Sequence, residues 1–276
     1  MLHLVPVSFT AVGELMLDLG ITSGDEPHNA AIYTRVGGTA ANAAVWAAAA
    51  GASAACVGRV GDDAAGLAIR AALEERGVAV ELTTDPEART GVVALVDGDL
   101  LVDRGANRSL SVSDLRALDA DAVLVSGYAL LHEDSAQAAR VALAGSAGWT
   151  AATAGSPGLL RRVVPYPFAG ARLLVANAAE ARALTGSEPA EAARLLAKRH
   201  ELAGVTLGAD GALLATAERL LRCAGTTIAG LAAPGAGDAF AAALLVALAE
   251  GVPPEAALEA ACAAGAAAAA SADGWP

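Results

Sequence analysis

Residues 233–240 read APGAGDAF, and the alanine- and leucine-rich run after them predicts a helix over about 237–250. Pro234 pre-sets a turn, and Gly235, Ala236 and Gly237 place free backbone N–H groups at the helix start. Such a turn is an anion site, both by geometry and by the helix dipole. Asp238 then has two interpretations: a helix cap, or a catalytic base beside an anion that it helps to transfer.

The rest of the chain alternates short apolar runs with longer alanine-rich runs, which predicts a parallel sheet covered by helices on both faces. Strands are expected within 8–14, 53–61, 121–127, 149–155 and 172–177, and a strand, a glycine turn and a second strand within 204–216. Helices are expected at about 40–50, 65–77, 133–144, 180–185, 189–202, 237–250 and 255–271.

Two segments, 15–36 and 89–104, depart from this pattern because they are more polar and alternate between apolar and polar residues. Asp97-Gly98-Asp99 separates two apolar runs in the second segment, which is a hairpin signal. We expect the two segments to form a small sheet beside the main domain.

Composition narrows the function. The 276 residues are 55% apolar but only 3% aromatic, so alanine supplies the surplus, and the formal net charge is −12. That charge repels phosphate backbones and argues against nucleic-acid binding. The C-terminal alanine run carries Glu255 and Glu259 and is expected to pack rather than span a membrane. Three scattered cysteines and no basic region at the N-terminus indicate reduced thiols in a cytoplasm.

A glycine-rich stretch at 37–66 precedes and follows the first expected helix. Gly37 and Gly38 allow close backbone approach, and Asn42 lies one turn into the helix, where its amide can reach back to a bound group. Alone, the stretch is equally an ordinary turn and helix start. It is not a dinucleotide-binding fingerprint, and the chain has no GxxxxGK[ST] phosphate loop.

Four motifs in order make the chain resemble the ribokinase-like (PfkB) carbohydrate kinases. The first family signature is matched at Gly37, Gly38, Asn42, Ala44, Gly51 and Gly61, and the second at Gly235, Ala236, Gly237 and Asp238. Between them, Asn177 and Glu180 match an NxxE motif, and Thr206, Gly208 and Gly211 match the nucleotide-side strand and turn. Residues 12–18 resemble the opening strand, with Asp18 at its end.

The resemblance implies a three-layer α/β/α fold with a mostly parallel sheet, one kinase domain over 1–276, and a small β lid from 15–36 and 89–104. It implies an enzyme, a transferase that uses ATP and Mg²⁺. Asp238 would be the base, the amides of Gly235, Ala236 and Gly237 the anion hole, and Glu180 a Mg²⁺ contact through water. Asn177, Thr206, Gly208 and Gly211 would face the nucleotide. Without the other motifs, Asn177 and Glu180 would be an ordinary helix start with a solvated acid.

On the acceptor side, the resemblance assigns substrate contacts to Asp18, Gly37, Gly38, Asn42 and Arg104. Carboxylate and amide groups can hold neighbouring hydroxyls in a bidentate way, whereas Arg104 is equally a solvated arginine at a strand end. The lid is a dimer contact in many relatives, which implies a homodimer here. An aspartate at a helix N-terminus is expected to have a low pKa, and phosphoryl transfer tolerates so weak a base.

One departure bears on cofactors. The family usually has an acidic or polar residue and then threonine before the GAGD motif, where this chain has Ala232 and Ala233, and this speaks against activation by potassium. The first interpretation is an ATP-dependent kinase acting on a primary hydroxyl of a sugar or sugar acid, of fructokinase or 2-keto-3-deoxygluconate kinase type. A ribose or nucleoside kinase is a second interpretation, and a catalytically weak sugar-binding protein is a third.

Overall fold

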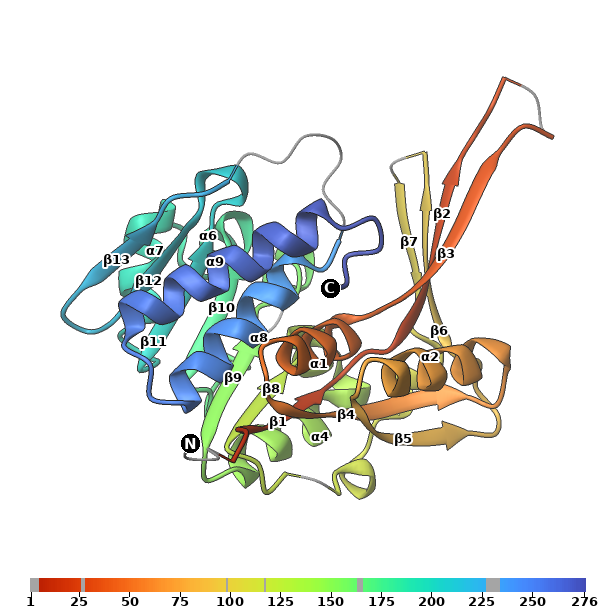
Figure 1. Cartoon of the computed structure of the whole chain (residues 1–276), viewed down its shortest axis with the longest axis horizontal. Coiled ribbons are helices and arrows are strands. Elements are labelled where there is room, and N and C mark those ends of the chain that lie inside the picture. Colours follow the sequence, from red (N-terminus) through yellow and green to blue (C-terminus); the bar gives the residue numbers. More distant parts are fainter. Residues whose placement is uncertain (1–4, 26–27, 98, 117, 163–165, 227–233) are drawn as a thin grey trace.

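The protein is described by a computed structural model that covers residues 5–25, 28–97, 99–116, 118–162, 166–226 and 234–276. Two sheets organise the chain: a large sheet between two layers of helices, and a small sheet that stands away from those layers (Figure 1). This is the expected three-layer α/β/α arrangement with a small additional sheet. In the described part of the chain, no helix is long and apolar enough to cross a membrane.

The large sheet has the strand order β13-β12-β11-β10-β9-β8-β1-β4-β5. Its strands are β1 Ser8–Val12, β4 Ser53–Gly61, β5 Ala79–Asp85, β8 Ala122–Val125, β9 Trp149–Thr153, β10 Leu173–Asn177, β11 Leu202–Thr206, β12 Ala212–Ala215 and β13 Leu220–Cys223. β12 and β13 run antiparallel to their neighbours, and the other pairings are parallel. Buried apolar residues therefore fill both faces of the parallel strands.

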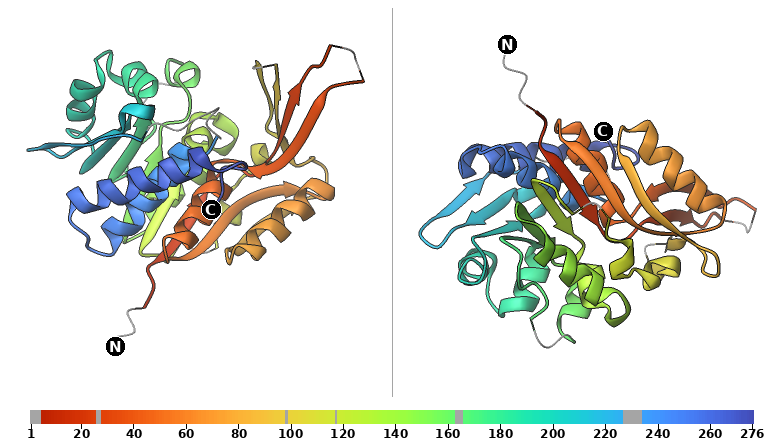
Figure 2. Two further views of the ribbon diagram at one scale, coloured as in Figure 1. Left: turned by 45° about the horizontal axis from the view of Figure 1, so that its top comes forward. Right: turned by 90° about the horizontal axis from the view of Figure 1, so that it is seen from below.

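Helices cover each face, and each layer packs over its own apolar core (Figure 2). One face carries α1 Thr39–Ala49, α2 Ala64–Glu75, α8 Ala236–Ala249 and α9 Pro254–Ala270. The other carries α3 Gly127–Leu131, α4 Glu133–Gly145, α5 Pro157–Leu160, α6 Ala178–Thr185 and α7 Pro189–Leu196. Single 3₁₀ turns lie at η1 Gly105–Ser109, η2 Val112–Asp114 and η3 Gly208–Asp210.

Helix α8 is buried continuously from Ala239 to Leu248. Alanine favours helix and carries almost no side chain, so α1, α8 and α9 can pack closely together on one face of the sheet. At Gly265 of α9, for example, an added Cβ would lie 3.2 Å from the Ala236 carbonyl oxygen. The alanine surplus of the sequence therefore forms a thin interface between these helices.

The strand order reverses between β1 and β8. From β1 the chain builds outward through β4 and β5, then returns to β8 on the other side of β1 and continues to β13. In open α/β sheets, ligands bind at the carboxyl ends of strands beside such a switch point. The strand ends followed by Glu14, Ser126, Gly155 and Asn177 should therefore surround a ligand site.

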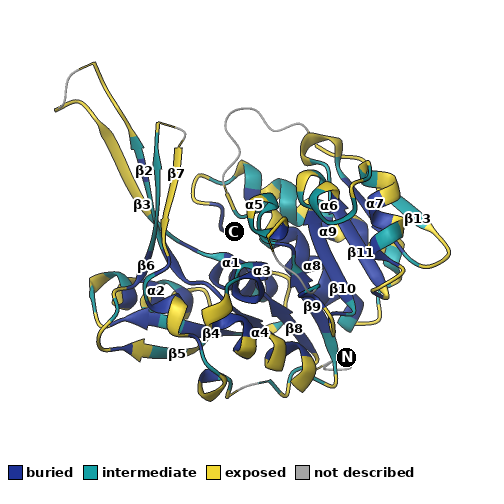
Figure 3. Cartoon of the chain, turned by 180° about the vertical axis from the view of Figure 1, so that it is seen from behind, coloured by how far each residue is buried: buried dark blue, intermediate teal, exposed yellow. Residues whose placement is uncertain are grey.

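The small sheet has the order β3-β2-β6-β7 and is formed by the two segments whose rhythm differs, 15–36 and 89–104. Its strands are β2 Met16–Thr22, β3 Ala31–Gly37, β6 Gly91–Val96 and β7 Asp99–Asp103. β2 and β6 are parallel, while β2–β3 and β6–β7 are antiparallel. Much of β3 and all of β7 are exposed (Figure 3). The predicted hairpin turn includes Gly98, which lies outside the described residues.

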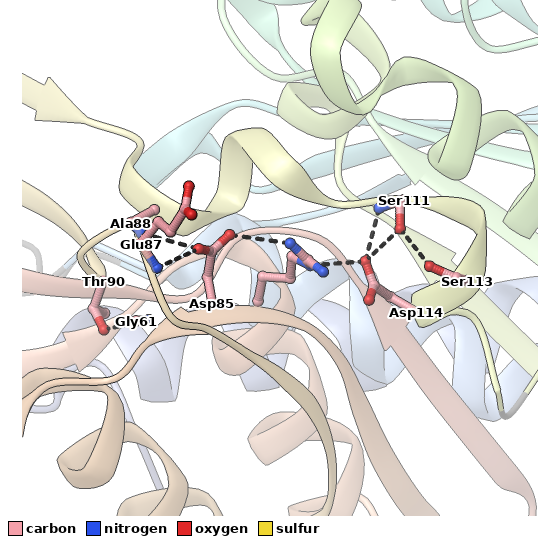
Figure 4. A network of polar contacts seen from close by, with 9 residues as sticks. Gly61, Asp85, Glu87, Ala88, Thr90, Ser111, Ser113 and Asp114 are labelled. Atoms are coloured by element: carbon pink, nitrogen blue, oxygen red, sulfur yellow. Dashed lines mark hydrogen bonds and ion pairs between the residues drawn. The ribbon is translucent and has the colours of Figure 1, made fainter.

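An ion-pair network holds the base of the small sheet (Figure 4). Arg59 of β4 donates from Nη1 to Asp85 and from Nε to Asp114, each at 3.0 Å. Asp85 also accepts from the backbone N–H groups of Glu87 and Ala88, which begin the segment that leads into β6. The direction in which β6 leaves the large sheet is therefore fixed by one half-buried arginine.

Some elements differ from the sequence expectation. β5 and β13 are strands that the sequence pattern does not reveal, because their residues are short mixed runs with mostly intermediate burial. The helix expected over 189–202 ends at Leu196, and residues 197–200 form turns before β11. The other expected elements are present to within a few residues of their predicted bounds.

The turn from β3 into α1 yields a stability prediction with a matched control. Gly38 and Gly51 have nearly the same φ, +95° and +96°, but a Cβ at Gly38 would lie 2.4 Å from the Glu14 carbonyl oxygen, whereas a Cβ at Gly51 would meet no atom within 4 Å. We expect Gly51→Ala to lower the free energy of unfolding by about 1–2 kcal/mol through backbone strain alone. Gly38→Ala adds a clash and should lower it by more than about 3 kcal/mol. Urea unfolding measures both, and equal losses would contradict the close approach.

Candidate active site

Three cavities lie in line along the carboxyl ends of the strands. The first, of about 430 Å³, lies between the small sheet and the large one, the second of about 230 Å³ lies at the start of α8, and the third of about 260 Å³ lies against α9. The first two share Thr39 and Tyr128, and the last two share Thr206 and Gly237. We call them the acceptor-side, central and distal cavities. The central cavity, which Asp238 lines, therefore adjoins both of the others, and we refer to the three adjoining cavities together as the path.

The start of α8 forms one wall of the central cavity. Gly235 is the N-cap residue with φ of +105°, and Ala236, Gly237 and Asp238 form the first helical turn. The first N–H groups of a helix have no partner within it, and they carry the positive end of the helix dipole. At Gly237 a Cβ would meet no atom within 4 Å, so open space borders this turn. The helix start expected from the sequence is thus present and borders open space, and its role as an anion site stays a prediction.

Asp238 is held by a residue from the other end of the chain. The Asn42 Nδ2 amide of α1 donates to Asp238 Oδ2 at 2.8 Å. The pKa of Asp238 is raised to about 7, mainly by burial; the Asn42 hydrogen bond lowers it, and the nearby charges of Glu180, Glu14 and Asp18 raise it. The expectation of a low pKa is therefore wrong, because removal of water from the carboxylate outweighs the favourable helix N-terminus.

Asn177 and Glu180 form a capping box at the start of α6. Asn177 Oδ1 accepts from the Glu180 N–H, and Glu180 Oε2 accepts from the Asn177 N–H, both at 2.9 Å. Both also line the central cavity, and burial raises the pKa of Glu180 to about 7. Glu180 is thus not the solvated acid of the simpler interpretation. A half-buried carboxylate with one committed oxygen is a hard oxygen donor that suits Mg²⁺.

The distal cavity contains Thr206, Gly208 and Gly211, as the family resemblance suggested, together with residues that the sequence did not single out. Gly208 has φ of +61°, and Gly211 has φ of +90° with its Cβ position only 2.1 Å from the Cys223 carbonyl oxygen. These glycines form the turn between β11 and β12, which lies close to the end of β13. The walls are small and mostly apolar, including Ala212, Phe240 and Ala266.

Several side chains assigned to the acceptor already bond to other residues of the protein. Asp18 of β2 is ion-paired through Oδ2 with Arg35 of β3, at 2.8 Å from Nη2. The Asp18 carboxylate also fills the space beside Gly37, because a Cβ there would lie 2.5 Å from Oδ2. Asn42 Oδ1 accepts a hydrogen bond from Trp275, and Asn42 Nδ2 donates one to Asp238. The expected bidentate contact of this amide with an acceptor is therefore not available in this arrangement.

Arg104 is buried, with 6% of its surface exposed, so it is not a solvated arginine at a strand end. Its Nη1 lies 2.6 Å from Asp134 Oδ1, and its Nη2 donates to Ser135 Oγ at 2.9 Å. Its Nε has no hydrogen-bond partner among the described residues. Arg104 lines the acceptor-side cavity beside Arg108 and His132, which the sequence analysis did not select.

Several further residues at the site were missed. Glu14 is buried after β1, bonds to Ser126 through Oε2, and has its pKa raised by burial. Tyr128 lies between the acceptor-side and central cavities, and burial followed by the charges of nearby acids raises its pKa to about 12. Both follow strands adjacent to the switch point, a signal that becomes usable once the strand order is known. Ala232 and Ala233, on which the potassium expectation rests, lie outside the described residues.

The sandwiched, mostly parallel sheet with a small additional sheet is the ribokinase fold, and in this chain an acid, a helix start and a half-buried glutamate lie at its switch point. A sequence profile described as "pfkB family carbohydrate kinase" matches residues 8–274. The chain therefore belongs to the pfkB family of carbohydrate kinases, and the predicted family, fold and enzyme class are confirmed.

Individual relatives differ in what they act on. The chain is 36% identical over 111 residues to ribokinase of Bacillus subtilis (strain 168), a match that spans 36% of this chain and 38% of that ribokinase. Its structure is similar to an adenosine kinase from Sinorhizobium meliloti (TM-score 0.85, 21% identity, 98% of this chain and 96% of the other). It is also similar to a fructokinase double mutant from Vibrio cholerae O395 with fructose, ADP and potassium bound (TM-score 0.83, 25% identity, 99% and 95%).

The raised pKa of Asp238 predicts a pH-dependent stability difference. Between about pH 4 and pH 7 the folded protein keeps a proton that the unfolded chain releases, so the contribution of Asp238 to stability falls as the pH rises through this range. We expect Asp238→Asn to unfold with a free energy about 2 kcal/mol higher than the wild type at pH 8, and nearly equal at pH 4.5. This difference is roughly half of the free energy that corresponds to a shift of three pKa units, because the side of the carboxyl group that faces the cavity stays hydrated.

Urea unfolding at the two pH values measures this difference, with the exposed aspartate variant Asp210→Asn as the control for loss of one negative charge. If Asp238→Asn is less stable than the wild type at pH 8, the ionised carboxylate stabilises the folded protein, which would contradict this prediction.

Proposed function

We propose that this chain is an ATP-dependent kinase that phosphorylates a primary hydroxyl of a sugar or sugar acid, with Asp238 as the base. The supporting observation is that Asp238 and the start of α8 line the central cavity, which shares wall residues with a cavity on each side. The acceptor would occupy the acceptor-side cavity and the nucleotide the distal cavity. In this proposal, residues 1–276 act as one cytoplasmic kinase domain whose small sheet is the lid.

Phosphoryl transfer then proceeds between the two ends of the path. The acceptor hydroxyl gives its proton to Asp238, its oxygen forms a bond to the terminal phosphorus of ATP, and the bond to the bridging oxygen breaks to release ADP. A pKa near 7 suits a general base at neutral pH. The N–H groups of Gly235, Ala236 and Gly237 hold the charge of the transferring group, as a helix start does for anions.

The nucleotide side rests on Asn177, Thr206, Gly208 and Gly211. Thr206 lines both the central and distal cavities, so it lies where the phosphates would cross between them. Mg²⁺, held through water by Glu180, would neutralise phosphate charge. The described linings of these two cavities contain no lysine or arginine, which makes the backbone amides and the cation the available positive partners.

The acceptor contacts of this proposal are Asp18, Gly37, Gly38, Asn42 and Arg104, of which Gly38 and Arg104 line the acceptor-side cavity. Asp18 can offer Oδ1, since Arg35 engages Oδ2. Arg104 is neutralised by Asp134, whereas Arg108 is exposed and has no ion pair among the described residues. Because Arg108 lines this cavity, it is the better candidate to bind an acidic group on a sugar.

A nucleoside or ribose kinase is the second candidate, supported by the size and the aliphatic wall of the acceptor-side cavity. Val93, Leu100, Val102 and Leu159 line it, which would suit an apolar substituent on a sugar. Tyr128 is the single aromatic residue of that described lining, so stacking on a base is limited. A catalytically weak sugar-binding protein is a third candidate, and the complete central cavity argues against it.

The small sheet also supports a homodimer. Ile32 and Tyr33 of β3 and Leu100, Leu101 and Val102 of β7 are exposed, between 52% and 66%. Both strands are edges of the sheet, and exposed apolar edge strands favour pairing with another chain. A second copy of this chain, packed lid to lid, is the partner that we propose.

The base is tested by turnover. We expect ADP release with ATP and Mg²⁺ to depend on an acceptor from a panel of sugars, sugar acids and nucleosides, and Asp238→Asn to lower kcat by about 10²–10⁴-fold. Asp210→Asn should retain activity. Near-normal turnover by Asp238→Asn would refute the base, and binding of an acceptor without turnover in the wild type would favour the sugar-binding protein.

The acceptor class is tested at Arg108. If the acceptor carries an acid group, Arg108→Ala should raise KM for it about tenfold, the loss of one charge-assisted hydrogen bond, while KM for ATP stays constant. A neutral sugar in the same assay is the internal control, because its KM should not respond. If KM rises equally for neutral and acidic acceptors, Arg108 does not recognise the acid group.

A further inference from the structure

Residues 271–276, which follow α9, are built into the active site. Trp275 is buried, with 6% exposed, and its indole Nε1 donates to Asn42 Oδ1 at 2.9 Å. Asn42 Nδ2 donates in turn to Asp238 Oδ2 at 2.8 Å. A relay of two hydrogen bonds therefore joins this segment to the aspartate at the centre of the path.

The segment is held in place from several sides. Trp46 Nε1 of α1 donates to the Gly274 carbonyl at 2.9 Å, and the Arg76 guanidinium lies 5.2 Å from the centre of the Trp275 ring. Gly274 has φ of +76°, and a Cβ there would lie 2.4 Å from the Pro234 carbonyl oxygen. The segment thus packs against both α1 and the turn that begins α8.

The chemistry of the indole decides the orientation of the Asn42 amide. The oxygen and nitrogen of an amide have nearly the same shape, so packing alone does not choose between the two orientations. An indole N–H only donates, so Asn42 must present its oxygen to Trp275 and its NH₂ to Asp238. In the reverse orientation, two acceptor oxygens would face each other at Asp238.

We propose that Trp275 is a positioning residue for phosphoryl transfer: its indole N–H fixes the amide of Asn42, which holds the carboxylate of Asp238 toward the acceptor. This inference rests on the proposed role of Asp238 as the base. Loss of the relay lets the amide turn, so the carboxylate loses its orientation and its hydrogen-bond donor. The groups that shift the pKa of Asp238 are Asn42 of α1, Glu180 of α6, Glu14 after β1 and Asp18 of β2, and Tyr128 of α3 lines the same cavity.

Trp275→Phe keeps the ring and removes the N–H. We expect it to lower kcat about 3- to 20-fold, to leave KM for ATP unchanged, and to move the ascending limb of the pH–rate profile to higher pH, because an Asn42 donor to the carboxylate is lost. Trp46→Phe is the matched control: it also loses one buried indole bond to this region, but to the Gly274 backbone rather than to Asn42. We expect it to keep kcat and the pH profile.

The variant Asn42→Ala completes a double-mutant cycle with Trp275→Phe. If Trp275 acts through Asn42, adding Trp275→Phe to Asn42→Ala should change kcat by less than twofold. Equal kcat values and pH profiles for Trp275→Phe and Trp46→Phe, or full additivity with Asn42→Ala, would overturn the positioning role.

A measurement without turnover separates this inference from the proposed function. In ¹⁵N-labelled protein, we expect the indole N–H resonance of Trp275, assigned by its loss in Trp275→Phe, to shift with pH near 7 and to stop shifting in Asp238→Asn. A resonance that ignores pH in the wild type overturns the relay. A titrating resonance in a protein without acceptor-dependent turnover supports the relay and removes the kinase proposal instead.

Discussion

The burial of α8 is the constraint on which the site depends. Residues from Ala239 to Leu248 are enclosed by the sheet and by α1 and α9, so the helix can neither slide nor tilt without opening the core. Its N-terminus therefore lies at a fixed position beside the carboxyl ends of β8, β9 and β10. The packing of the buried part of α8 thus places the free amides and the Asp238 carboxylate at the switch point.

That packing also sets the electrostatics. Asp238, Glu180 and Glu14 all have raised pKa values, with burial as the largest cause in each case. On the acceptor side, Arg35 is paired with Asp18 and Arg104 with Asp134, whereas Arg108 has no ion pair among the described residues. The central cavity is thus lined by acids, in a protein that is acidic overall, and the positive partners that it offers to an anion are helix amides rather than basic side chains.

The sequence predicted what local chemistry determines. Glycines at 37–38 and 235–237 and the alternation of strands and helices were enough for the fold and for the helix start that carries Asp238. It did not predict interactions between distant residues: Asn42 and Asp238 are 196 positions apart, and Asn42 and Trp275 are 233 apart. The pKa of Asp238 was misjudged for the same reason, since a local rule for helix starts contains no information about burial by other elements.

Two of the buried acids share a further property. Asp238 and Glu180 both have pKa values near 7, and the negative charge of Glu180 raises that of Asp238. When two such groups interact, protons leave the pair in macroscopic steps that belong to neither residue alone. A cation bound by these carboxylates would therefore displace a proton near neutral pH. Heat measured on binding will consequently include the ionisation enthalpy of whichever buffer accepts that proton.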